Sequence, residues 1–131
     1  MAQMVRDARV KFTRELSGTL TVQSVDRDGI RINNRYWSET IALTPQEIID
    51  NWIPVPVREL VEEHFATVLA SSPELVIVGT GAKAEFPPRE LTFAFARRGV
   101  GLEVMDTAAA ARTFNVLAGE GRRVAAVLYT G

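Results

Sequence analysis

The sequence predicts an α/β fold, in which an antiparallel β-meander precedes a run of alternating strands and helices. Residues 19–43 alternate polar and apolar side chains between turn-forming residues, as half-buried strands do. Residues 57–71 place apolar side chains at the spacing of one helix face. The apolar runs at 75–78, 102–105 and 124–129 do not alternate, which is typical of strands covered on both faces.

The meander is predicted from three short strands and two turns. Residues 19–25 form the first strand, and residues 26–29 supply a turn in which glycine can take a positive φ. The alternation resumes over 30–32, two asparagines supply a second turn, and a third strand is expected over 36–43. Residues 1–16 are mixed and charged, and we expect a partly disordered arm there, followed by the meander over 17–43.

Residues 45–56 fit two structures. Thr44, Pro45 and Glu47 match a helix start, with a capping box and proline at the first helical position. The segment 48–53 is short and rich in β-branched residues, and prolines follow it, so it fits a brief strand equally well. Both interpretations stay open.

An α/β portion is predicted over 57–131. A second helix is expected over 88–98, with Gly99 as its C-cap. A third helix begins at Asp106 or Thr107, which can cap it, and runs to about residue 117. The first helix is expected over 57–71, and its apolar face comprises Val57, Leu60, Val61, His64, Phe65, Val68 and Leu69.

Composition limits the classes of function. The 131 residues fit one domain, and 15 basic against 16 acidic residues give a net charge of −1, which creates no global attraction for nucleic acid. The absence of cysteine and the single histidine argue against thiol chemistry and a zinc site. No apolar run approaches the length of a membrane span, and the N-terminus lacks a signal-peptide pattern. We expect a cytoplasmic domain that is not an integral membrane protein, with no nucleic-acid partner, no metal and no cofactor.

The glycine-bounded loop that follows residues 75–78 formally matches the dinucleotide-binding pattern G-x-G-x-x-A over 79–84. That pattern requires its glycines to open a helix whose N-terminus meets the pyrophosphate. The segment 86–88, Phe-Pro-Pro, delays the helix, so we reject a dinucleotide site. A longer, irregular loop can still cradle an anion through its backbone N–H groups, and its candidate residues are Gly79, Thr80 and Gly81.

Five further polar residues extend this candidate pocket. Asp106 and Thr107 follow a strand at the edge where ligand crevices of α/β folds form, and Arg112 and Asn115 share a helix face. Two structural alternatives stand beside the pocket: helix capping by Asp106 and Thr107, and an ion-pair network through Asp106, Arg112, Glu120 and Arg122. No catalytic residue is predicted. The candidate pocket comprises Gly79, Thr80, Gly81, Asp106, Thr107, Arg112, Asn115 and Arg122.

Three other side chains have a structural and a functional interpretation. His64 lies on the apolar face of the first predicted helix, and we expect a histidine at the edge of the core with a backbone partner rather than a catalytic base. Trp37 and Trp52 belong either to the core or to an exposed aromatic patch that contacts a protein partner.

Several spaced blocks in the C-terminal half resemble one domain family, and they are residues 76–81, 86–87, 101–107, 110–117 and 120–126. This family includes the adipogenesis-associated domain protein and mitochondrial complex I assembly factor 3. The resemblance implies a three-layer α/β fold, with a mixed central sheet, helices and an accessory N-terminal β-hairpin layer. It also implies that bacterial members are soluble proteins without an assigned activity, whereas the complex I role belongs to the mitochondrial branch and acts through protein partners.

Two hypotheses of function follow. The first is a non-enzymatic protein-binding or assembly-factor-like module. The alternative is a small-molecule or nucleotide (anion) binding protein whose pocket lies at the loop face of Gly79–Gly81 and Asp106. Whether the chain is an enzyme stays open.

Overall fold

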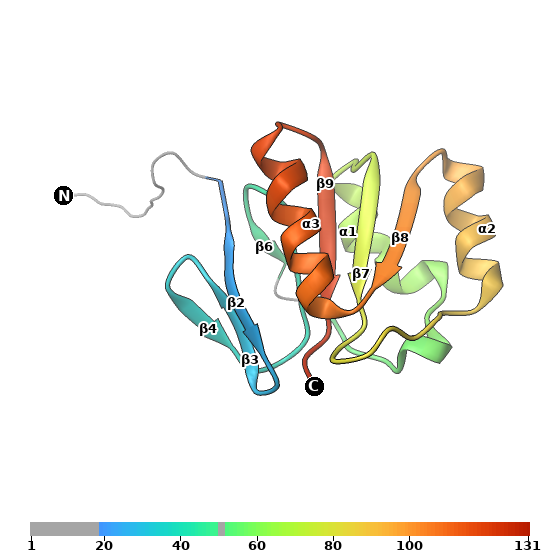
Figure 1. The fold of residues 1–131 in the computed structure, drawn as a ribbon. Helices are drawn as coiled ribbons and strands as arrows, with labels where there is room; N and C mark the ends of the chain where they lie inside the picture. Colours follow the sequence, from blue (N-terminus) through green and yellow to red (C-terminus); the bar gives the residue numbers. More distant parts are fainter. Residues whose placement is uncertain (1–18, 50–51) are drawn as a thin grey trace.

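The computed structural model describes residues 19–49 and 52–131, which form two sheets and several helices (Figure 1). The smaller sheet is antiparallel and contains β2 (Val22–Asp26), β3 (Gly29–Ile32) and β4 (Arg35–Trp37). The predicted arm over 1–16 lies outside the described residues. The larger sheet has the strand order β6-β5-β9-β7-β8, with bounds β5 (Ile41–Leu43), β6 (Ile48–Ile49), β7 (Leu75–Gly79), β8 (Gly101–Met105) and β9 (Val124–Leu128).

The larger sheet is mixed. Strand β7 pairs in parallel with both β8 and β9, whereas β5 runs antiparallel to β9, and β6 runs antiparallel to β5. All five residues of β9 are buried, because strands flank it and other elements cover both of its faces. The predicted α/β class and the mixed central sheet are therefore confirmed.

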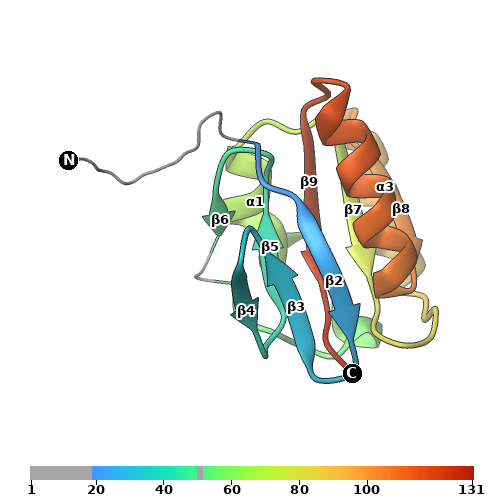
Figure 2. The same ribbon diagram turned by 60° about the vertical axis from the view of Figure 1, so that its left-hand side comes forward.

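Two apolar clusters occupy the two faces of the central sheet. On one face, α3 (Thr107–Gly119) and the three-stranded sheet lie side by side over a cluster that includes Phe114 and Ile77 (Figure 2). The other face is covered by four helical segments around Phe65 and Phe95. These segments are the 3-10 helices η1 (Val57–Glu59) and η2 (Glu62–Phe65), and the α-helices α1 (Ala66–Ala70) and α2 (Arg89–Arg98).

The prediction of one strand over 36–43 is wrong. Strand β4 ends at Trp37, and after residues 38–40 the chain enters the central sheet as β5, which pairs with β9. All three residues of β5 are buried, because this strand is covered on both faces, whereas β4 lies at an edge and stays largely exposed.

The open question at residues 45–56 is answered in part. Strand β6 covers Ile48–Ile49, and residues 52–56 have no regular secondary structure. The hydroxyl of Thr44 accepts hydrogen bonds from the N–H groups of Gln46 and Glu47, both at 3.2 Å, and the Thr44 N–H donates to the Glu47 carbonyl at 2.8 Å. These bonds close a turn between two strands, so Thr44 does not cap a helix.

The prediction of a continuous helix over 57–71 is also wrong. Leu60 is extended, with φ −65° and ψ 131°, and separates η1 from η2. In a continuous α-helix the Val61 N–H would bond the Val57 carbonyl, but here it donates to Nδ1 of His64 at 3.0 Å. The break lets Leu60 enter the core completely, while Val61 stays 46% exposed. His64 is half-buried with a backbone partner, as predicted.

Candidate functional site

The glycine-bounded loop leaves β7 at Gly79 and reaches α2 only at Arg89, as the delayed helix start predicts. Gly79 allows the loop to lie against α3, because a Cβ at this position would be 2.8 Å from Thr107 Cα and 2.9 Å from Ala110 Cβ. This close approach brings the carboxyl end of β7 to the start of α3.

Thr107 holds the loop to the start of α3. Its hydroxyl accepts a hydrogen bond from the Gly81 N–H at 2.7 Å and donates to the Tyr129 carbonyl at 2.7 Å. Its own N–H donates to the Gly81 carbonyl at 2.9 Å. Because Thr107 is only 1% exposed, these bonds are sheltered from water. Thr107 therefore joins the ends of β7 and β9 to α3.

Three consecutive backbone N–H groups at the start of the loop, those of residues 80–82, are already bonded within the protein. Thr80 donates to the Met105 carbonyl at 2.9 Å, Gly81 donates to Thr107, and Ala82 donates to the Gly131 carbonyl at 3.0 Å. An anion at this loop would have to displace one of these bonds. The donors that made the loop a candidate anion cradle are therefore occupied.

A cavity of about 290 Å³ lies beside the loop. Gly81, Asp106, Thr107 and the turn residues Asp26 and Arg27 contribute to its lining. Asp106 caps α3, since its carboxylate accepts a hydrogen bond from the Ala109 N–H at 2.8 Å.

The second carboxylate at this cavity is also bonded. Hydrogen bonds from the backbone N–H of Asp28, the hydroxyl of Tyr36 and the N–H of Gly29 lower the pKa of Asp26, so it stays ionised at neutral pH. Within the part of the chain that the structure describes, two carboxylate side chains and one guanidinium thus line the cavity, which gives an anion little electrostatic advantage.

The structure does not bring all eight predicted pocket residues together. The three loop residues gather with Asp106 and Thr107, as described above. Arg112 is exposed on α3 and does not line the cavity. Arg122 lies beyond the other end of α3, roughly 20 Å along the helix axis, and its Nε donates to Glu74 at 2.8 Å. The alternative ion-pair network through Asp106, Arg112, Glu120 and Arg122 does not form among the residues that the structure describes.

Asn115 has a structural role that the sequence did not indicate. Its Oδ1 accepts a hydrogen bond from the Val22 N–H, and its Nδ2 donates to the Val22 carbonyl, both at 2.9 Å. The side-chain amide thus pairs with β2 as a neighbouring strand would. It joins α3 to the accessory sheet and does not face the glycine loop.

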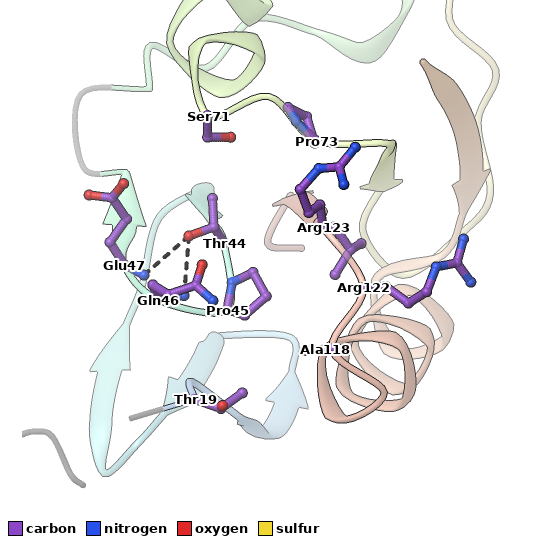
Figure 3. Close-up of a pocket in the computed structure, with 12 residues that line it drawn as sticks. Thr19, Thr44, Pro45, Gln46, Glu47, Ser71, Pro73, Ala118, Arg122 and Arg123 are labelled. Carbon is purple, nitrogen blue, oxygen red and sulfur yellow. Dashed lines mark hydrogen bonds between the residues drawn. The ribbon is translucent and has the colours of Figure 1, made fainter. Parts of the chain in front are cut away.

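Sequence reasoning missed a polar hollow of about 370 Å³ at the other end of the central sheet (Figure 3). The Thr44 turn, Ser71, Pro73 and the segment that precedes β9 line it. Arg123 is held there, because its Nε donates to the Ser72 carbonyl at 3.1 Å. No sequence signal marks this hollow, since its walls come from segments far apart in the chain, which meet through the pairing of β9 with β5 and β7.

Both tryptophans pack against the two clusters of the core. Trp37 adjoins the cluster under α3, and Arg35 stacks over its ring at 4.6 Å from the centroid. Trp52 makes an edge contact with Phe65, with 5.1 Å between the ring centroids. Of the two interpretations left open for Trp37 and Trp52, the packing favours the core.

Of the exposed large apolar side chains, Tyr36 and Ile53 are chain neighbours of the two tryptophans, and three others are on or near α2. Phe93 on α2 is 53% exposed, and Phe86 in the loop before α2 is 77% exposed. Val61, beside η2, faces α2 across a groove. Val116, on the other side of the central sheet, is an isolated example on α3.

Comparisons with known proteins place this fold in a family. Human NADH dehydrogenase (ubiquinone) 1 alpha subcomplex assembly factor 3 is 32% identical over 117 residues, which are 88% of this chain and 63% of the human protein. The 13 kDa major membrane protein of Francisella tularensis subsp. holarctica is 31% identical over 91 residues, 70% of each chain. Within residues 19–49 and 52–131 of the present chain, no helix has the length and apolar character needed to cross a membrane.

A crystal structure of a Bordetella parapertussis protein has a TM-score of 0.81 and 30% identity to this chain, and the match covers 89% of this chain and 100% of that one. This chain spans less than two thirds of the human assembly factor. Residues 22–129 match the family described as "Protein of unknown function (DUF498/DUF598)". The chain therefore belongs to the DUF498/DUF598 family.

Proposed function

We propose that this chain is a protein-binding module of the assembly-factor type, and that the α2 side of the molecule is its binding surface. The observation that carries the proposal is the exposure of Phe93 on α2 and of Phe86 in the loop before it, with Val61 exposed across a groove from the same helix. Large apolar side chains that gather on one part of a surface are typical of interaction sites. Aromatic residues are also enriched at the centres of protein interfaces.

The relatives support this assignment. The human relative's name describes it as an assembly factor of a subcomplex, and 88% of the present chain aligns with it. A domain shared with such a protein fits a role in contacting other proteins. Fold alone does not decide the matter, since one α/β scaffold serves many functions.

The small-molecule alternative rests on the cavity beside the glycine loop. Its volume of about 290 Å³ is near the lower end of ligand pockets. However, the N–H groups of residues 80–82 are already bonded, and Asp26 and Asp106 would oppose an anion. Among the described residues, Arg27 is the one basic residue of the cavity lining. We therefore place this alternative second.

The proposal is tested by comparing two exposed apolar residues. Tagged wild type, Phe93→Ser and Val116→Ser would be expressed in the source cells, and captured proteins quantified by mass spectrometry after cross-linking. We expect one captured protein to fall at least about tenfold with Phe93→Ser, because truncation of a central aromatic contact costs about 1.4 kcal/mol or more. Val116→Ser is the matched control and should leave capture unchanged, because Val116 is similarly exposed but lies on α3.

Equal capture by all three proteins would overturn the proposal. A parallel thermal-shift screen with nucleotides, phosphate and carboxylates tests the alternative. A rise in melting temperature with one of these compounds, abolished by Arg27→Ala, would favour the cavity beside the loop instead.

A further inference from the structure

We propose that the groove between η2 and α2 binds an amphipathic helix of a partner protein, and that this helix carries basic residues on both sides of its apolar face. The inference rests on the proposed protein-binding function and specifies the surface and the chemistry of the partner. The groove has a volume of about 360 Å³. Its walls are η2, with the residues just before it, and one side of α2 from Pro88, just before the helix, to Arg97 in its last turn.

The floor of the groove is apolar. It is formed by Leu60 and Val61 on one side and by Pro88, Leu91 and Ala94 on the other. Leu91 and Ala94 are three residues apart and share one face of α2. Apart from the extended residues Leu60 and Val61, the walls are helical, and among the described residues no assigned strand lines the groove, so an added β-strand would find no sheet edge here. A helix that inserts its apolar face is the occupant that this shape favours.

The two walls are held together beneath the groove. Phe65 at the end of η2 contacts Phe95 of α2 edge to face, with 5.2 Å between ring centroids. A salt bridge between Glu62 of η2 and Arg98 of α2 links the walls a second time. A groove with fixed walls is formed before binding, so less conformational entropy is lost when a partner docks.

Acidic side chains lie on both walls. Glu63 comes from η2 and Glu90 from α2, and both contribute to the lining. Across the ranges 19–49 and 52–131, neither carboxylate has an ion-pair partner, whereas Glu62 is engaged by Arg98. Arg97 is the one basic residue that the described part of the chain contributes to the lining. A helix in the groove would therefore meet a carboxylate on each side, and lysine or arginine at those positions would complement them.

The test uses two synthetic helical peptides of about 16 residues, a length at which an isolated helix can form. One peptide carries leucines at helical spacing flanked by lysines, and the other carries glutamate in place of every lysine. Binding is measured by fluorescence anisotropy and by NMR titration of the isotope-labelled full chain. We expect the lysine peptide to shift the amide signals of Val61, Leu91 and Ala94, and the glutamate peptide to bind at least about tenfold more weakly.

The decisive experiment reverses the charges of the protein's groove. In the variant Glu63→Lys/Glu90→Lys, the preference should reverse, so that the glutamate peptide binds more tightly. The matched control Glu103→Lys/Glu120→Lys alters two exposed glutamates outside the groove and should keep the original preference. Equal affinity of the two peptides for the wild type, or signal shifts outside the groove, would overturn the inference.

The same variants separate this inference from the proposed function. If Phe93→Ser abolishes capture of the cellular partner but Glu63→Lys/Glu90→Lys does not, the acidic groove is not the docking site and the inference fails alone. If neither variant alters capture, the proposed function fails as well. Loss of capture with both variants, together with the reversed peptide preference, supports both.

Discussion

Replacement of Asn115 by alanine should destabilise the fold strongly, although Asn115 is a polar residue on a helix surface that faces the accessory sheet. Its amide group makes two hydrogen bonds of 2.9 Å with the backbone of Val22, and Val22 is only 5% exposed. Each hydrogen bond contributes about 0.5–1.5 kcal/mol net, and a buried group left without a partner costs about 1–3 kcal/mol. We therefore expect Asn115→Ala to lower the free energy of unfolding by about 2–3 kcal/mol.

That loss should be visible in two measurements. At about 4 °C per kcal/mol for a domain of this size, the melting temperature should fall by roughly 8–12 °C. Urea unfolding followed by circular dichroism gives the free energy directly, and hydrogen exchange of the Val22 amide reports the local effect. Asn115→Asp should also destabilise the fold, because a carboxylate accepts a hydrogen bond from the Val22 N–H but has no donor for the Val22 carbonyl.

Arg112→Ala is the matched control, since Arg112 is one turn earlier on α3 and exposed. Its effect should stay within about 0.5 kcal/mol, as for most surface substitutions. If Asn115→Ala costs no more than Arg112→Ala, then the amide does not hold β2 to α3 and the structural role assigned to it is wrong.

Three further predictions follow from the loop and the end of β9. Gly79→Ala should cost about 1–3 kcal/mol, because the new methyl group would lie 2.8 Å from the Thr107 Cα. Gly119→Ala should stabilise the protein by about 0.5–1 kcal/mol, because a Cβ there would meet no atom within 4 Å beyond the neighbouring backbone of its own helix. Urea unfolding in which the two effects had the opposite signs would refute this account. Thr107→Val should cost about 2–3 kcal/mol in the same assay, because it leaves the Gly81 N–H without its acceptor, while Thr107→Ser keeps the hydroxyl; equal losses would contradict the role of the hydroxyl. Burial raises the pKa of Tyr129 to about 12 from 10.0, so the unfolded chain binds fewer protons between these values and stability should fall as pH rises through that window. The fall should be smaller in Tyr129→Phe, where Tyr36, whose pKa is also raised by desolvation, still contributes; an identical pH dependence would show that Tyr129 is not a source of the fall.

Elements with strong local signals could be predicted from the sequence. Pro88 before α2 and Gly99 after it mark the ends of that helix, and Gly99 adopts the left-handed conformation expected of a C-cap, with φ 72°. The carboxylate of Asp106 marks the start of α3 in the same way. These signals act within one helical turn, so no knowledge of the rest of the fold is needed.

Elements decided by distant contacts could not be predicted. Residues 57–71 have the apolar spacing of one helix, but His64 takes the N–H of Val61 and the helix breaks at Leu60. The chain also leaves the accessory sheet after Trp37, because the apolar strand β5 pairs with β6 and β9 in the central sheet. In both cases tertiary packing overrides a plausible local pattern.

The residues of the candidate pocket show the same difference between local signals and distant contacts. The glycine loop and Thr107 meet because the carboxyl ends of neighbouring parallel strands share one edge of a sheet, which the order of elements implies. Asn115 and Arg122 have partners 93 and 48 residues away in the chain, Val22 and Glu74, and no local pattern indicates either pairing.

The central claim is that the α2 side of the molecule binds a partner protein. Its most direct test is to purify the captured partner and to measure its affinity for the wild type and for the Phe93→Ser and Val116→Ser variants by isothermal titration calorimetry. Both side chains are large, apolar and exposed, at 53% and 59%, but they lie on helices that cover opposite faces of the central sheet. If the α2 side binds protein, Phe93→Ser should weaken the complex at least about tenfold while Val116→Ser leaves it unchanged. Equal affinities of the two variants and the wild type would contradict the claim.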